Sequence, residues 1–203
     1  FCKALKCRSG APESFSKFSF VGGVAHYWKL LAGKASSVSQ AQRLYFEPSA
    51  ILAEEPIRLV RDEGAIGSLP RALLDLVGRG VTKPSELASR VGTVQSNLSR
   101  PLALLLELKL IHRDLPFGES SRTTKRVFYS IQDPALLFYY GTYLPARSRW
   151  GGLSPREKRL LLHQHTARVW EHFCRQLYPG AGRYWEKDVE IDLVCWRGSQ
   201  GHY

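Results

Sequence analysis

The sequence predicts a fold of the α+β class that is mainly helical with a small β-component. Apolar residues recur at helical spacing in several segments of the 203-residue chain, which is typical of helices with one buried face. Two short strand patterns lie close together after residue 110, and an apolar alternation begins near residue 189. The hydrophobic fraction of 44% is ordinary for a globular protein that buries a core.

The chain is organised around residues 69–131. The order of elements there, three short helices followed by two strands, is that of a winged helix, a variant of the helix-turn-helix. A polar loop joins the two strands. The predicted helices cover residues 69–77, 84–92 and 96–108, and the predicted strands cover residues 111–115 and 126–131.

Local signals support each of these helices. Pro84 suits the first turn of a helix, where its missing N–H costs nothing. Gly92 lies where a helix end favours a left-handed residue. Pro101 fits only if the third helix begins near residues 97–100, because proline is tolerated in the first turn alone. Leucines then give that helix an apolar stripe: Leu98, Leu102, Leu105, Leu106 and Leu108.

The polar end of the third helix and the loop between the strands carry the candidate nucleic-acid-binding residues. A recognition helix presents its N-terminal residues to base edges, and cations beside it contact phosphates. The net charge of +11 favours an anionic partner. The sequence therefore predicts double-stranded DNA as the partner, although the same architecture can also serve as a protein-docking module. The candidates are Gln95, Ser96, Asn97, Ser99 and Arg100 in the helix, and Arg122, Lys125 and Arg126 in the loop.

Cysteine usage and hydropathy argue against a zinc-binding protein, a disulfide-rich secreted protein and a membrane protein. The four cysteines, Cys2, Cys7, Cys174 and Cys195, are scattered without a zinc-binding spacing, so reduced thiols and a cytoplasmic location are expected. No signal peptide or membrane-spanning run is present, and no membrane partner is expected. Because the chain contains no methionine, we expect it to be a fragment or a truncated product.

Further helices are predicted on both sides of the centre. Asp133 and Pro134 are typical of a helix start. The aromatic residues that follow them are expected to pack internally rather than to stack on bases. The longest helix is expected to bury a face that includes Leu160 and Trp170. These helices cover residues 24–31, 39–52, 54–63, 134–143 and 155–177, with no clear element over 1–13 and a linker over 145–153.

Two segments before the centre resemble the lid region of the archaeal-type ATPases, P-loop proteins of the signal-transduction-ATPase group. They are residues 21–27 (VGGVAHY) and 44–56 (LYFEPSAILAEEP). The winged-helix pattern and residues 131–140 and 185–194 are similar to the domains that follow the lid in that family. This resemblance implies a helical lid remnant over 1–64, a winged-helix DNA-binding domain over 65–132, and an aromatic helix, a linker and a truncated restriction-endonuclease-like domain over 133–203.

The resemblance also implies a metal-dependent nuclease of the PD-(D/E)XK type, or an inactive remnant of one. In such nucleases a helix glutamate and a strand aspartate bind Mg²⁺, and the positions that match here are Glu171 and Asp192. Without the resemblance, both residues would be ordinary solvated side chains on a helix and a strand. His163, His165 and His172 on the same helix are expected to be ordinary surface or hydrogen-bonded histidines.

The sequence departs from the family at two motifs. The Glu-x-Lys strand that completes the nuclease site is not found, and neither is the phosphate loop that binds ATP. We therefore expect no cofactor and no catalysis in this chain alone. Mg²⁺ and ATP would be cofactors of the parent protein, and the parent's own ATPase domain would be a partner. A module that relays the state of that ATPase by docking remains the third alternative.

Overall fold

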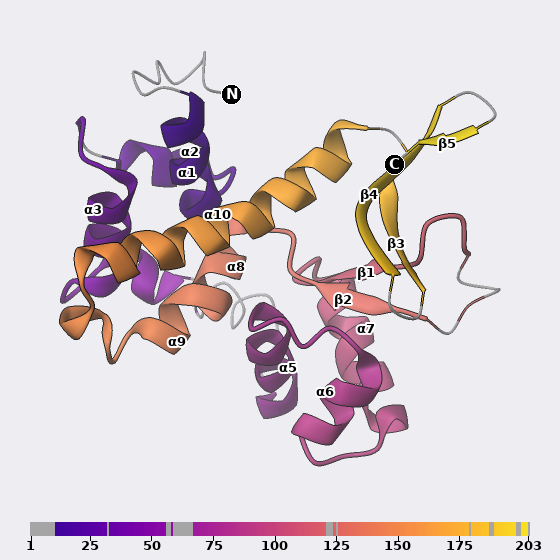
Figure 1. Cartoon of the computed structure of the whole chain (residues 1–203). Coiled ribbons are helices and arrows are strands. Elements are labelled where there is room, and N and C mark those ends of the chain that lie inside the picture. The colour runs from indigo at the N-terminus through magenta and orange to yellow at the C-terminus, as the bar shows by residue number, and fades with distance from the viewer. Residues whose placement is uncertain are drawn as a thin grey trace.

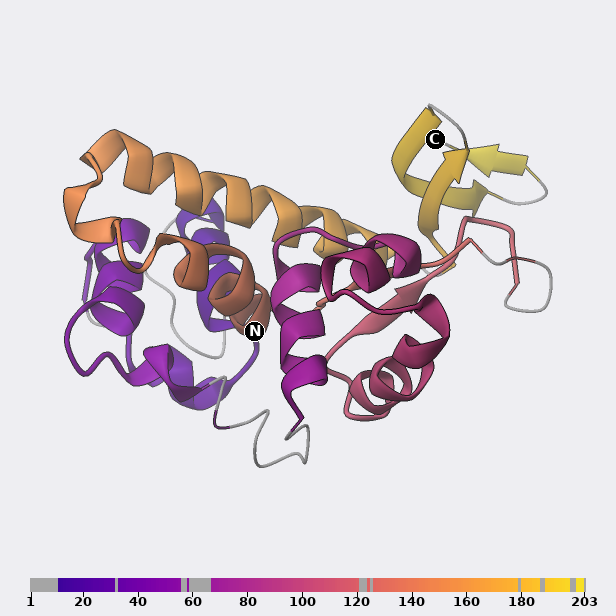
Figure 2. The same cartoon turned by 90° about the horizontal axis from the view of Figure 1, so that it is seen from below.

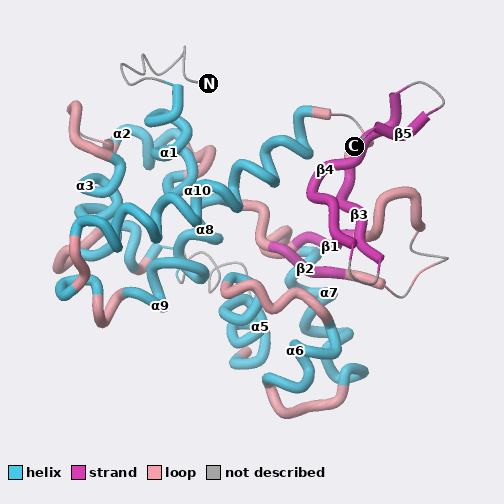
Figure 3. Tube along the Cα trace, viewed as in Figure 1, coloured by secondary structure: helices cyan, strands magenta, loops and turns pink. Residues whose placement is uncertain are grey.

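The computed structural model describes residues 11–31, 33–55, 58, 67–120, 124, 126–178, 180–186, 189–197 and 200–202. This part of the chain is mostly helical, with two small antiparallel sheets, so the predicted α+β class is confirmed. A long helix, α10 (Pro155–Leu177), runs from one group of helices to the C-terminal sheet, and a second group of helices lies beside it (Figures 1 and 3). Figure 2 shows the same arrangement from below.

The first group begins with α1, which the sequence did not predict. Its residue Phe15 packs edge-on against Trp170 and Phe173 of α10, with ring centroids 5.0 and 5.4 Å apart. The helix predicted over 54–63 lies mostly outside the described residues. The elements of this group are α1 (Ala11–Val21), α2 (Ala25–Lys29), α3 (Ser37–Ala41), the π-helical turn η1 (Gln42–Phe46) and the 3-10 turn η2 (Ile51–Ala53).

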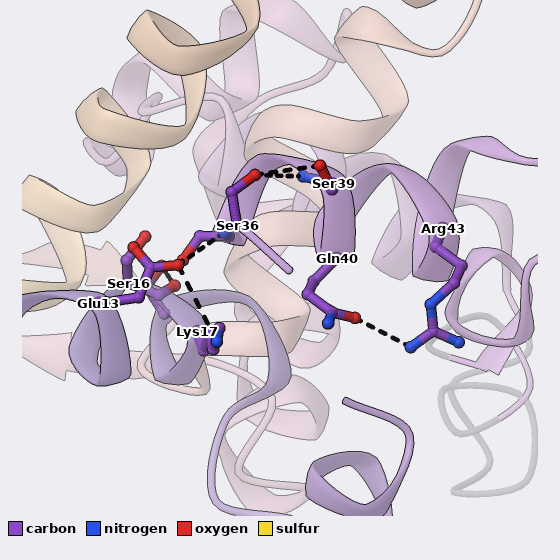
Figure 4. Close-up of polar contacts among 9 residues, drawn as sticks. Glu13, Ser16, Lys17, Ser36, Ser39, Gln40 and Arg43 are labelled. Carbon is purple, nitrogen blue, oxygen red and sulfur yellow. Dashed lines mark hydrogen bonds and ion pairs between the residues drawn. The ribbon is translucent and has the colours of Figure 1, made fainter. Parts of the chain in front are cut away.

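Polar contacts join α1 to α3 (Figure 4). A carboxylate oxygen of Glu13 accepts hydrogen bonds from the backbone N–H and the hydroxyl of Ser37, both at 2.7 Å. Lys17 lies 4.0 Å from the same oxygen. The hydroxyl of Ser36 caps α3 by accepting from the N–H of Ser39. Glu13 and its neighbours therefore have a structural role.

An aromatic segment after the central region completes the same group. Asp133 caps it, since its carboxylate accepts from the N–H of Leu136 at 2.8 Å. Phe138 and Tyr139 are 1% exposed, so the packing role predicted for these rings is confirmed. Trp150, placed in a linker by the sequence, is instead buried and stacks on Phe46 at 3.7 Å. The segment contains α8 (Pro134–Phe138), η4 (Tyr139–Tyr143), α9 (Leu144–Ala146) and η5 (Trp150–Gly152).

Helix α10 (Pro155–Leu177) matches the predicted range. Ser154 and Glu157 form a reciprocal capping box at its start. Its buried positions are Leu162, His165 and Val169. The predicted face was wrong in part, because Leu160 and Trp170 are 54% and 50% exposed.

The second group of helices and the first sheet correspond to the centre predicted from the sequence. Helix α5 approaches η4 so closely that a Cβ on Gly78 would lie 2.3 Å from the Cβ of Tyr140. Arg168 of α10 also donates to the carbonyl of Gly78 at 2.9 Å. The elements are α5 (Ser68–Gly78), α6 (Pro84–Arg90), the 3-10 turn η3 (Gln95–Leu98), α7 (Ser99–Glu107), β1 (His112–Asp114) and β2 (Phe128–Ser130).

The C-terminal sheet has the order β3-β4-β5, with both pairs antiparallel. The register between β3 and β4 shifts by one residue after the pair Gly182–Val194. Val194, which lies beyond this irregularity, is buried, while Val189 at the start of β4 is 54% exposed. The strands are β3 (Gly182–Glu186), β4 (Val189–Arg197) and β5 (Gln200–His202). Among the described residues, every helix is too short or too polar to cross a membrane.

Candidate nucleic-acid interface

The turn between α6 and η3 sets the direction of the third helix. Gly92 has a φ of +69°, and the N–H of Thr93 donates to the carbonyl of Ala88 at 3.0 Å. This is the left-handed helix end that the glycine predicted. Helix α7 begins at Ser99, which places Pro101 in its first turn as expected.

The third helical unit presents a polar end to solvent and an apolar side to the core. Leu98 and Leu105 are fully buried, and Leu102 is 5% exposed. The amide of Asn97 donates to the hydroxyl of Thr93 at 2.9 Å, which orients it and leaves its oxygen available as an acceptor. The five predicted contact residues in this unit are all exposed: Gln95, Ser96, Asn97, Ser99 and Arg100.

The hairpin of β1 and β2 lies beside this helix. Its register pairs Arg113 with Tyr129. Tyr129 also donates from its backbone N–H to the carbonyl of Thr82 at 2.9 Å, which ties the hairpin to the segment before α6. Two of the predicted loop cations, Arg122 and Lys125, lie outside the described residues.

Arg126, the third predicted cation, is exposed but has partners. It forms an ion pair with Glu119 and donates to the carbonyl of Trp185 in β3 at 3.3 Å. An ion pair at the surface contributes little stability and is weakened by salt. Arg126 is therefore not a free cation, because Glu119 neutralises its charge. It can exchange Glu119 for a phosphate at a modest cost in free energy.

Other cations near the third helix have no ion-pair partner within the described part of the chain. They are Lys83, Arg100 and Arg113, all exposed. Arg79 and Arg90, by contrast, pair with Asp75 and Glu86 one helical turn away, at 2.9 and 3.2 Å. Lys83 and Arg113 were not predicted from the sequence. Only the structure distinguishes them, because Lys83 lies just before α6 and Arg113 is exposed on β1.

A cleft of about 310 Å³ opens at the junction of the third helix, the hairpin and β3. Phe128 and Trp185 stack in its wall, with ring centroids 4.3 Å apart and planes inclined by 12°. The ammonium of Lys83 lies 5.8 Å from the centre of the Phe128 ring. The cleft is lined by Lys83, Pro84, Ser85, Gln95, Arg126, Val127, Phe128, Trp185 and Glu186. Among the lining residues only Gln95 and Arg126 were predicted.

The acidic residues of the nuclease hypothesis lie together on α10 and β4. The pKa of Glu171 is raised, first by burial and then by the charge of Asp192. Arg175 donates to the backbone carbonyl of Asp192 at 3.1 Å, and the Nε of Arg183 lies 3.7 Å from its carboxylate. Arg183 also pairs with Glu190.

These residues do not by themselves make a metal centre. Mg²⁺ and Ca²⁺ bind through several oxygen ligands, and within the described residues no group of three acidic, cysteine or histidine side chains could hold an ion. Two guanidinium groups, of Arg175 and Arg183, already balance the charge of the carboxylates. Glu171 and Asp192 alone therefore do not complete a metal site among the described residues, and we derive no catalytic step from them.

Two histidines of α10 are more buried than expected. The Nε2–H of His165 donates to the carbonyl of Ser19 at 2.5 Å, while its Nδ1 is buried without a partner in the described structure. Burial lowers the pKa of His165 to about 4. The pKa of His172 is lowered to about 4 first by burial and then by Arg175. The expectation of ordinary surface or hydrogen-bonded histidines was therefore wrong for His172 and only partly right for His165.

Comparisons with known proteins add one distant relative. The uncharacterized protein MJECL04 of Methanocaldococcus jannaschii is 24% identical over 140 aligned residues. The alignment covers 62% of this chain and 32% of that protein, so the chain spans about a third of the relative's length. No family model and no solved structure matches the sequence.

Proposed function

We propose that this chain is a DNA-binding region built on a winged helix, in which η3 and α7 read the duplex and the hairpin contacts its backbone. The observation that carries the proposal is that the third helical unit has one side buried in the core and one polar end exposed to solvent. Leu98, Leu102 and Leu105 are buried, whereas Gln95, Ser96, Asn97, Ser99 and Arg100 are all exposed. A polar end that is free of the core is what a recognition helix requires.

The electrostatics support the same partner. Arg100 belongs to the polar end, Lys83 lines the same cleft as Gln95, Arg113 is exposed on β1, and the whole chain has a net charge of +11. Lys and Arg at such positions neutralise phosphates and release counterions, which makes the affinity fall as salt rises. Val94, 62% exposed beside Gln95, offers an apolar contact of the kind that a thymine methyl accepts.

The experiment is a fluorescence anisotropy titration of a short labelled duplex at several salt concentrations. Arg100→Ala is expected to weaken binding to all sequences and to reduce the slope of log affinity against log salt by about 1. Arg159→Ala is the matched control, because it removes the same charge from an exposed position near the start of α10. Equal effects of the two substitutions would refute a specific interface at the third helix.

We further propose that the region belongs to an archaeal-type ATPase, whose ATP-binding domain would be its partner in a cytoplasmic parent protein. Support comes from the ordered resemblance of the segments around residues 21–27, 44–56 and 131–140. A purified parent protein that hydrolyses ATP, with DNA changing the rate, would be the expected result. If the chain binds no duplex at low salt, docking onto another protein becomes the better account of the exposed polar end.

A remnant of a metal-dependent nuclease is the second candidate function. It is supported by Arg175, one helical turn from Glu171, which donates to the backbone carbonyl of Asp192 at 3.1 Å, and by the charge of Asp192, which helps to raise the pKa of Glu171. In a parent with a third ligand, such carboxylates would bind Mg²⁺, which lowers the pKa of a bound water and neutralises charge on the phosphate. Mg²⁺-dependent cleavage by the parent should then be lost in Glu171→Gln and Asp192→Asn, and cleavage that survives both would exclude the site.

A further inference from the structure

The cleft beside the third helix combines groups that come from distant parts of the chain. Lys83 precedes α6, Gln95 begins η3, Phe128 opens β2, and Trp185 and Glu186 end β3. Its volume of about 310 Å³ is at the small end of the range for small-molecule sites, roughly 300–1,000 Å³. A space of this size suits one small planar group rather than an element of another protein.

Several contacts hold β3 against the hairpin, so the cleft is a fixed feature of the fold. The N–H of Phe117 donates to the carbonyl of Arg183 at 2.7 Å. Arg126 donates to the carbonyl of Trp185 at 3.3 Å, and Trp185 stacks on Phe128. The C-terminal sheet therefore extends the surface formed by the third helix and the hairpin (Figure 1).

The walls of the cleft match the parts of a nucleotide. Phe128 and Trp185 offer aromatic surface, on which bases stack regardless of sequence. The amide of Gln95 and the carboxylate of Glu186 offer hydrogen bonds to a base edge. Lys83 supplies an exposed cation with no ion-pair partner in the described structure, which suits a phosphate. The Tyr184 hydroxyl donates to Glu186 at 2.7 Å and positions its carboxylate.

We infer that this cleft holds one unpaired nucleotide of the bound DNA, with the base against the Phe128–Trp185 pair and the phosphate at Lys83. The inference rests on the proposed DNA-binding function and deepens it. Gln95 belongs both to the exposed end of the third helical unit and to the cleft, so a strand that leaves the recognition helix enters the cleft directly. The preferred substrate is then a duplex with a single-stranded tail, rather than a blunt duplex.

The test compares a blunt duplex with the same duplex carrying a single-stranded tail. The full chain is expected to bind the tailed DNA about tenfold more tightly, the order of effect of stacking one base. Trp185→Ala should remove this difference, and Trp185→Phe should retain most of it. Trp170→Ala is the matched control, because Trp170 is half exposed on α10 and outside the cleft.

A second variant tests the inference independently, in case Trp185→Ala fails to fold. Lys83→Ala combined with Glu186→Ala changes only exposed side chains and should also abolish the preference for the tail. Equal binding of tailed and blunt DNA by the unaltered chain would overturn the inference alone, as would a preference that survives in both variants. Failure to bind either DNA would overturn the proposed function and this inference with it.

Discussion

The backbone N–H of Tyr129 in β2 lies 2.9 Å from the carbonyl of Thr82, in the segment between α5 and α6. This hydrogen bond fixes the hairpin relative to α6 and the third helical unit. Gln95 of η3 and Phe128 of the hairpin both line the cleft, so these parts of the surface adjoin one another.

Gly78→Ala should destabilise the protein by about 3 kcal/mol, because overpacking a buried contact costs roughly this amount. A Cβ at this position would lie 2.3 Å from the Cβ of Tyr140, where α5 meets η4. Urea unfolding monitored by circular dichroism measures the effect. Gly151→Ala, where nothing lies within 4 Å, is the control and should change the free energy of unfolding little. Equal values for the two variants would show that α5 and η4 do not pack so closely.

Gly92→Ala should cost about 1 kcal/mol of stability, because a residue with a side chain is strained in the left-handed conformation. The φ of Gly92 is +69° and the space around it is open, so backbone strain is the only cause. Gly92→Asn should cost less, since asparagine tolerates this conformation better. A calorimetric series on the three proteins tests the order, and equal stability of the alanine and asparagine variants would contradict it.

Acidification should destabilise the fold between pH 6.5 and 4 through His165. Burial lowers its pKa from 6.5 to about 4 in the folded chain, so only the unfolded chain takes up the proton in this range. The neutral ring's full contribution is present above pH 6.5, and about 3 kcal/mol is lost once the pH reaches 4. Unfolding free energies measured across this range should fall less steeply in His165→Gln. An identical slope would show that His165 titrates normally.

Asp192→Asn should lower the pKa of Glu171 toward its ordinary value. Burial is the larger cause of the raised pKa and remains in the variant, so the return is partial. NMR titration of the labelled glutamate carboxyls follows this directly, with Glu190→Gln as a control on the same strand. A Glu171 pKa that does not respond to Asp192 would mean that the two carboxylates are apart, which removes the observation behind the nuclease hypothesis.

Local signals were sufficient for the elements whose ends have a chemical marker. The Ser154–Glu157 capping box marks the start of α10, Asp133 caps α8, and Gly92 marks the C-terminal end of α6. Pro101 correctly required a late start for α7. These features depend on residues only a few positions apart, so the sequence displays them completely.

The remaining features depend on contacts between distant segments. Helix α1 is held by rings that pack on α10, more than a hundred residues away. Apolar residues at 160, 161 and 162 could not reveal which side of α10 faces α1. The register between β3 and β4 shifts by one residue, which depends on how the two strands pair. The cleft unites Lys83 with Trp185, a pairing for which the sequence offers no local pattern.

The central claim is that the polar end of the third helix and its cationic surroundings bind duplex DNA. The most direct measurement is the affinity of the unaltered chain for a mixed-sequence duplex as salt rises. The account predicts tight binding at low salt and a linear fall of log affinity against log salt, at close to 0.9 per phosphate contacted. Undetectable binding at low salt, or an affinity that does not change with salt, would contradict it.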